Sequence, residues 1–247
     1  MNEFGIDTIS AVNSAVVSGS AFGIFRQGWF GYSDMGTNAY KTRTTWYSYD
    51  ASFQPNVQMF QAAGKPAGVY FFSHAWDAAS AKHEVDVTIQ RCVDLGITPD
   101  WPLFLDWEDT GGAAGSYQAL INIGITPTQS LIRTIFTAWC ERCVERGYRA
   151  GFYTNQWIAS SYLGTSYIDT LRNSGYWYWD AEWGVSSPWY NCDIWQSLND
   201  QQMSGVQVDY NYVKDDRVWA AYSNLPIWLK LYLANRGDKN GKCTVLL

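Results

Sequence analysis

Acidic side chains directly after an apolar segment give the strongest chemical signal in this sequence of 247 residues. Asp106 and Glu108 follow the apolar residues 103–105 and are separated by Trp107. Alternate residues of a strand point to the same side, so the two carboxyls share one face, with Cα atoms about 6.5 Å apart. Two close carboxyls push one pKa upward, which provides a proton donor beside an ionised partner. That pair is the apparatus of glycoside hydrolysis.

Two further acids come from the two ends of the chain. Asp7 lies at the end of the first predicted strand, and Asp209 lies at the end of the last one. In a closed barrel the first and last strands are neighbours, so four carboxyls would meet at one mouth. An isolated Asp-x-Glu is as compatible with a solvated strand end as with catalysis, whereas four converging acids are hard to explain as surface decoration.

Apolar runs alternate with helical patterns along the chain and predict the elements that position these acids. About eight runs have the length and composition of buried strands. They are Phe4–Ile9, Phe22–Gln27, Ala67–Ser73, Leu103–Trp107, Ala150–Thr154, Tyr176–Ala181, Asp193–Gln196 and Val206–Tyr210. The pattern predicts an α/β fold, an irregular (β/α) TIM-like barrel whose later helices are shortened or missing. An open doubly wound sheet is the alternative.

Three helices are marked by their ends. The spacing predicts a helix over 78–95 with Asp77 as its N-cap, and a shorter one over 56–63 that ends at Gly64. A third helix is expected to begin with Thr126 as N-cap and Pro127 at its first position, and to end at Gly147.

Six short motifs follow one another between residues 4 and 211. They are Gly-Ile-Asp-Thr-Ile-Ser (5–10), Asp-Ala-Ser-Phe-Gln-Pro-Asn (50–56), Gly-Val-Tyr-Phe-Phe (68–72), Leu-Asp-Trp-Glu (105–108), Tyr-Thr-Asn (153–155) and Ile-Trp-Gln (194–196) with Gly205 to Asn211. In this order they resemble the motifs of the glycoside hydrolase family 25 muramidases, or lysozymes. Arg26-Gln27-Gly28 replaces a strand end that usually contains Lys, and the connection 29–49 is longer than usual.

The resemblance implies a modified barrel that cleaves the β-1,4 bond between N-acetylmuramic acid and N-acetylglucosamine in peptidoglycan. It implies that Glu108 is the general acid and that Asp106 orients and polarises the N-acetyl group of the substrate or otherwise stabilises the oxocarbenium-like transition state. Asp7 and Asp209 would shape the charge field around them. The family is thought to retain configuration through substrate assistance, an exception to the two-carboxylate rule.

Aromatic residues make up 17% of the chain, with 14 Trp, more than a core usually requires. Flat rings suit the C–H faces of sugars, although core packing is at least as good an explanation for any single ring. Other stacking candidates include Tyr32, Trp46 and Trp183. The predicted substrate-binding residues are Tyr70, Tyr153, Trp195, Gln196, Asp180 and Arg26, with Trp195 as the first choice for a stacking platform.

Two segments are expected: a catalytic barrel over 1–216 and a C-terminal extension over 217–247 that docks on it. The net charge of −6 argues against nucleic-acid or anionic-membrane partners. The five cysteines are expected to be reduced thiols, and Cys140-x-x-Cys143 lacks the second half of a zinc site, so no metal or cofactor is predicted. A monomer acting on the peptidoglycan glycan strand is expected.

The sequence shows no secretory signal and no apolar run of membrane-spanning length. We therefore expect synthesis in a host cytoplasm and action at the bacterial cell wall, as for a phage endolysin or a virion-associated lysozyme. Two alternatives stay open, a hydrolase of chitin-like polymers and a non-catalytic cell-wall-binding module. The chitinase pattern would need acids at Trp101 and Phe104, and the intact acidic quartet disfavours a relict site.

Overall fold

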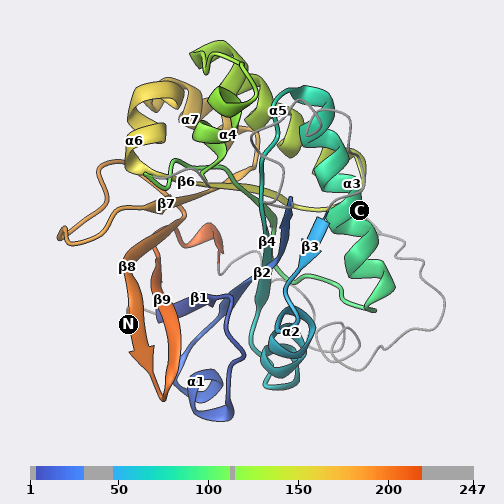
Figure 1. Ribbon diagram of the computed structural model, residues 1–247. Helices are drawn as coiled ribbons and strands as arrows, with labels where there is room; N and C mark the ends of the chain where they lie inside the picture. Colours follow the sequence, from blue (N-terminus) through green and yellow to red (C-terminus); the bar gives the residue numbers. More distant parts are fainter. Residues whose placement is uncertain (1–3, 31–46, 112–114, 219–247) are drawn as a thin grey trace.

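Eight strands close into a barrel in the computed structural model, which describes residues 4–30, 47–111 and 115–218 (Figure 1). The strands are β1 (Phe4–Thr8), β2 (Gly23–Phe30), β4 (Ala67–Phe72), β5 (Leu103–Asp106), β6 (Ala150–Asn155), β7 (Trp177–Ala181), β8 (Ile194–Met203) and β9 (Val206–Val213). The short strand β3 (Tyr47–Tyr49) pairs antiparallel with β2. Because β1 pairs with both β2 and β9, the sheet has no open edge there, and the barrel prediction is confirmed over the open sheet.

Seven neighbouring strands of this barrel are parallel, from β1 through β2 and β4 to β8, and β9 runs the other way. The connection from β8 to β9 is the two-residue turn Ser204–Gly205, in which both residues have positive φ, 52° and 80°. Such a turn matches the twist of a two-stranded ribbon, so the chain reverses at once and no helix intervenes. Figure 1 shows β8 and β9 (orange) side by side as a hairpin next to β1.

Helices cover the outer face of the barrel. They are α1 (Ser14–Gly19), α2 (Phe53–Ala62), α3 (Ala78–Asp94), α4 (Ser116–Asn122), α5 (Gln129–Glu145), α6 (Gln156–Ile158) and α7 (Thr165–Asn173), with a π turn at Ala159–Leu163. The described residues contain no helix between β7 and β9, so the expected shortening of the late helices is confirmed. Among the described helices, none has the length and apolar character needed to cross a bilayer.

Helix ends follow their capping residues, with one correction. Asp77 caps α3 as predicted, since its carboxylate accepts the N–H of Ser80 at 2.7 Å. The N-cap of α5 is Thr128 and not Thr126, because the Thr128 hydroxyl accepts the N–H of Leu131 at 3.2 Å. Both threonines can cap, and only the backbone path after Pro127 decides between them.

The core has two layers because residues along each strand alternate between the barrel interior and the helix layer. The interior is filled by aromatic and branched side chains that include Phe22, Ile24, Phe104, Trp179 and Val218. The outer layer packs strand residues such as Leu105 against α3 and α5. Four of the five cysteines are described, and all four are free and buried. This parity decides which strand residues can reach the mouth of the barrel.

The expected boundary at 216/217 falls close to the end of the described residues. Arg217 and Val218 are described and pack on the barrel, with Val218 fully buried in the interior cluster. Residues 219–247, the rest of the expected extension, lie outside the described part of the chain, as do the stacking candidates Tyr32 and Trp46.

Candidate active site

Side chains alternate along β5 in such a way that its two acids point inward at the carboxyl-terminal mouth of the barrel. Phe104 belongs to the interior cluster and Leu105 to the outer layer, so Asp106 points inward. Trp107 points outward again, where its ring packs against Phe136 with centroids 6.1 Å apart. Glu108 thus returns to the inner side, where it is partly exposed while Asp106 is buried.

Asp7 and Asp209 lie opposite each other on the paired strands β1 and β9. Directly opposed residues of an antiparallel pair have Cα atoms about 4.5–5.5 Å apart, so the two carboxyls are close neighbours. Asp209 is the fourth residue of its strand rather than its end, which corrects the expectation from the sequence. It reaches the same mouth because β9 is antiparallel and starts at the edge where the other strands finish.

Gln196 on β8 connects these two acids. Its amide Nε2 donates to Asp7 Oδ1 at 2.8 Å and to Asp209 Oδ2 at 3.3 Å. Its Oε1 accepts the hydroxyl of Tyr153 and the indole N–H of Trp183, both at 3.0 Å. These four partners fix the orientation of the amide, so its two donor hydrogens face the carboxylates.

A second amide, the side chain of Asn211, also donates a hydrogen bond to Asp7. Asn211 Nδ2 donates to Asp7 Oδ1 at 2.8 Å, and Asn211 Oδ1 accepts the indole N–H of Trp179 at 2.8 Å. Asn211 is the last residue of the six sequence motifs, and no role was predicted for it. Its partner Trp179 lies 32 positions away, so only the closed barrel reveals the contact.

The pKa values of all four acids are raised, mainly because burial disfavours the charged form. Burial together with the nearby Asp209 and Asp109 raises the pKa of Glu108 to about 8. Burial raises the pKa of Asp209 to about 6. The pKa of Asp7 is raised well above its usual value by burial and by Asp209, and that of Asp106 by burial and by Glu108. Glu108 is therefore protonated at neutral pH while remaining reachable.

Arg26 is the cation of the mouth. Its guanidinium forms a two-bond ion pair with Asp50 at 2.7 and 3.1 Å and stacks over Trp29, 4.5 Å from the ring centroid. Its charge works against the rise in the pKa of Asp106 and of the buried Tyr70. Arg26 and Tyr70 thus lie beside the acids.

Asp180 and Trp195, two of the predicted binding residues, point into the outer layer and not into the barrel. Asp180 is fully buried, accepts the Tyr178 hydroxyl at 2.6 Å and lies on the same side of β7 as that residue, whose ring stacks on Phe152 in the outer layer. Trp195 also belongs to the outer layer and donates its indole N–H to the Glu182 carbonyl at 2.9 Å. The structure therefore does not bring Asp180 or Trp195 to the ring of acids, the group formed by Asp7, Asp106, Glu108 and Asp209.

Trp183 offers the aromatic surface that Trp195 does not. It follows β7 directly, its ring is 46% exposed, and its indole N–H bonds to Gln196 between the two acids. Tyr153 and Gln196 also face the ring. Of the predicted binding residues, Tyr70, Tyr153, Gln196 and Arg26 thus lie beside the four acids.

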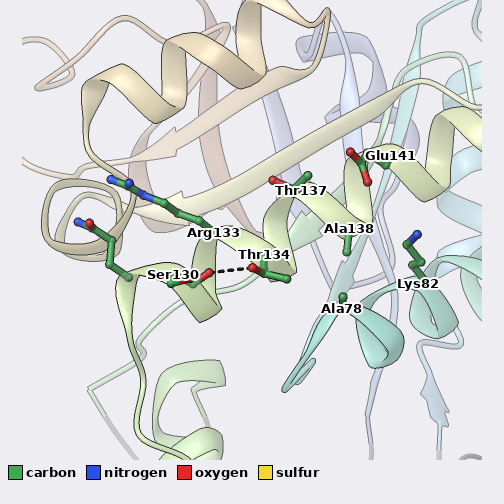
Figure 2. A pocket seen from close by; sticks show the side chains of 9 residues that line it. Ala78, Lys82, Ser130, Arg133, Thr134, Thr137, Ala138 and Glu141 are labelled. Carbon is green, nitrogen blue, oxygen red and sulfur yellow. Dashed lines mark hydrogen bonds between the residues drawn. The ribbon is translucent and has the colours of Figure 1, made fainter.

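A separate hollow lies outside the barrel between α3 and α5 (Figure 2). It has a volume of ≈ 460 Å³ and is lined by alanines and by polar side chains, including the charged Lys82, Arg133 and Glu141. None of the four acids lines it. Across residues 4–30, 47–111 and 115–218, no group of three His, Cys, Asp or Glu side chains could hold a metal ion.

A β/α barrel with a proton-holding carboxyl among other acids at its carboxyl-terminal mouth has the architecture of a glycoside-cleaving enzyme. The chain belongs to glycosyl hydrolases family 25, whose sequence model matches residues 27–206. No curated protein sequence is significantly similar to it.

Solved structures show the same fold. The modular autolysin LytC from Streptococcus pneumoniae, in complex with a synthetic peptidoglycan ligand, has a TM-score of 0.64 at 16% identity. This chain is covered to 86% but spans only 46% of LytC. The spore cortex lytic enzyme SleM from Clostridium perfringens gives 0.62 at 18% identity, with 86% of this chain and 67% of SleM covered. The CTP1L endolysin gives 0.61 at 18% identity, with 90% and 70% covered.

Proposed function

We propose that this protein is an N-acetylmuramidase, which hydrolyses the β-1,4 bond between N-acetylmuramic acid and N-acetylglucosamine in peptidoglycan. The observation that carries the proposal is Glu108, a rim carboxyl whose pKa is raised to about 8 within a ring of three other acids. A general acid must hold its proton at the working pH and reach the leaving oxygen. Glu108 meets both conditions, because burial keeps it protonated and its side chain is partly exposed.

Asp106 is proposed to orient the N-acetyl group that attacks the anomeric carbon. Its Oδ1 is buried and accepts no hydrogen bond from any described residue. A buried carboxylate oxygen without a donor is costly, and the N–H of a substrate amide would satisfy it. Burial and Glu108 raise the pKa of Asp106 although Arg26 opposes the rise, and the carbonyl oxygen of a protonated carboxyl can accept this bond as a carboxylate oxygen does. Such substrate assistance leads to retention of configuration.

Asp209 is proposed to supply the negative field of the site, since its pKa of about 6 leaves it ionised at neutral pH, and Asp7 lies opposite it on the paired strand. The field helps Glu108 to keep its proton, and it stabilises the positive charge that develops on the sugar ring as the bond breaks. Gln196 and Asn211 hold Asp7 in place, and Trp183 presents an exposed ring on which a sugar could stack.

The structural neighbours support peptidoglycan as the partner. LytC was solved with a synthetic peptidoglycan ligand, and SleM is described as a spore cortex lytic enzyme. We therefore propose a monomer that acts at the bacterial cell wall, as an endolysin or a virion-associated lysozyme, on the glycan strand and without a cofactor, nucleic acid or membrane partner.

The test is the release of reducing ends from purified peptidoglycan, with mass analysis of the products. The wild-type protein should release fragments that end in N-acetylmuramic acid. Glu108→Gln should lower the rate about 10²–10⁴-fold, because the amide cannot donate the proton, while binding to the wall survives. Glu145→Gln is the matched control and should retain most of the rate, because Glu145 is exposed on α5, outside the barrel.

Three results would overturn the proposal. Full activity of Glu108→Gln would show that another group is the acid. Faster turnover of chitin oligomers than of peptidoglycan would indicate a chitin-like substrate. Tight wall binding without any release of reducing ends would indicate a binding module.

A further inference from the structure

A buried carboxyl outside the ring of acids lies behind the catalytic strand. Glu84 on α3 is 2% exposed. Its Oε2 accepts the hydroxyl of Ser73, and its Oε1 accepts the backbone N–H of His74 at 3.1 Å. Ser73 and His74 are the first residues after β4, so Glu84 ties helix α3 to the β4–α3 connection at the mouth of the barrel.

That connection is bonded in turn to β5 at three points. The Ser73 N–H donates to the Asp106 carbonyl at 2.8 Å. The indole N–H of Trp107 donates to the Ala75 carbonyl at 3.2 Å. The third point runs through a serine on α4 and reaches the general acid itself.

Ser116 is the bridge to Glu108. Its hydroxyl donates to the Ser73 carbonyl at 2.6 Å and accepts the backbone N–H of Glu108 at 3.2 Å. Ser116 is 1% exposed, so these bonds are shielded from water. An unbroken series of hydrogen bonds therefore runs from the Glu84 carboxyl through Ser73 and Ser116 to the backbone of Glu108.

We propose that Glu84 is a positioning residue, which sets the placement of the Asp106–Glu108 segment through Ser73 and Ser116 without touching the substrate. The segment leaves strand β5 at Asp106, so Glu108 lies beyond the regular ladder and needs other bonds to hold it. General-acid catalysis is sensitive to misplacement, and an error of about 1 Å can cost about 10²-fold in rate. The inference rests on the proposed function, because it assigns Glu84 a role in the same reaction.

The groups around Glu84 make a conservative test possible. Burial raises the pKa of Glu84 to about 8. Glu84 in turn helps to raise the pKa of Tyr47, a titratable side chain on β3. Glutamine fills the same volume and can still accept the His74 N–H, but its amide nitrogen can only donate to Ser73, as the protonated carboxyl of Glu84 does. Glu84→Gln therefore reverses the bond that the ionised carboxylate accepts from the Ser73 hydroxyl, without leaving a cavity.

The experiment compares Glu84→Gln, Ser116→Ala and the double variant with Asp86→Asn. Asp86 lies on the same helix but pairs with Arg142 on the protein surface, so it is the matched control. We expect each single variant to lower kcat about 5- to 30-fold with little change in KM, and to displace the alkaline limb of the pH–rate profile. The double variant should lose little more than the worse single variant, since both break one series of bonds.

The failure of this inference can be told apart from the failure of the proposed function. An inactive wild-type protein refutes the muramidase, whereas an active wild type with unchanged kcat in Glu84→Gln and Ser116→Ala refutes the positioning role. Additive effects in the double variant, or a lower Tm with an unchanged pH profile, would reduce Glu84 to a structural residue. A ¹³C titration of the Glu108 carboxyl should show the same displacement without any substrate.

Discussion

The two ends of the barrel bury carboxylates in opposite ways. At the amino-terminal end, Asp193 is fully buried between the guanidinium groups of Arg172 and Arg217. Its Oδ2 also accepts the N–H of Tyr178 at 2.7 Å. At the mouth, Asp7 is buried with two amides as hydrogen-bond partners, and the charge opposite it is Asp209.

The difference separates a structural use of a buried acid from a chemical one. A carboxylate between two cations keeps its charge and holds elements together. A carboxylate among other carboxylates tends to hold a proton, since burial and repulsion both disfavour its charge. The acids at the mouth therefore lower the stability of the fold but can hold a proton. The ion pairs at the opposite end stabilise the contacts between β8, α7 and the segment after β9.

The largest expected effect on stability is at the amino-terminal end. Asp193→Asn leaves two guanidiniums without their shared anion and should lower the free energy of unfolding by about 3–5 kcal/mol, measured by urea denaturation. The control is Asp215→Asn, because Asp215 pairs with Arg172 at 2.9 Å but is 36% exposed. That change should cost about 1 kcal/mol or less. Equal losses in the two variants would contradict the comparison.

The same substitution at the mouth should have the opposite signature. Asp7→Asn keeps an oxygen that can accept from Gln196 and Asn211, and it removes a buried carboxyl that forms no ion pair with a described residue. We expect an unchanged or higher free energy of unfolding at pH 8, together with a loss of rate of about 10²-fold. A clear destabilisation with normal activity would show that Asp7 is structural.

The last expected effect is a dependence of the free energy of unfolding on pH. The pKa of Glu108 is about 8 in the folded protein against 4.5 when unperturbed, so the folded state binds the extra proton between these values. Stability from this group should be greatest below pH 4.5 and decline as the pH rises towards 8. The rate should also decline above about pH 8, when the acid loses its proton. Unfolding at pH 5 and pH 8 should show a shallower slope in Glu108→Gln, and an equal slope would contradict the assignment.

Much of this fold could be predicted because its strands are unbroken apolar runs. All eight predicted strands begin within one residue of the observed ones, and every one overlaps its counterpart. The acids could be predicted as well, since each follows or interrupts such a run. The direction of β9 was not predicted, although the short gap between residues 196 and 206 was a signal for it, because parallel neighbours need a crossover of a dozen or more residues.

The side of the strand to which a residue points explains why Asp180 and Trp195 lie outside the ring of acids. Tyr178, Trp179 and Asp180 are all buried, so no apolar–polar alternation shows which of them faces the barrel interior. Only the packing of Trp179 inside places Asp180 outside. Glu84 was missed for a related reason, since its partners lie in a connection and nothing in a helical pattern distinguishes a buried acid from a solvated one.

The reversed last strand also divides the site into a fixed half and an adaptable half. Asp7 and Asp209 sit inside a continuous backbone ladder, closed by a two-residue turn that leaves no room for insertions. Glu108 leads into the connection 109–115, whose length the barrel does not dictate. New substrate preferences can therefore arise by remodelling such connections, while the spacing of the paired aspartates is inherited unchanged from the sheet.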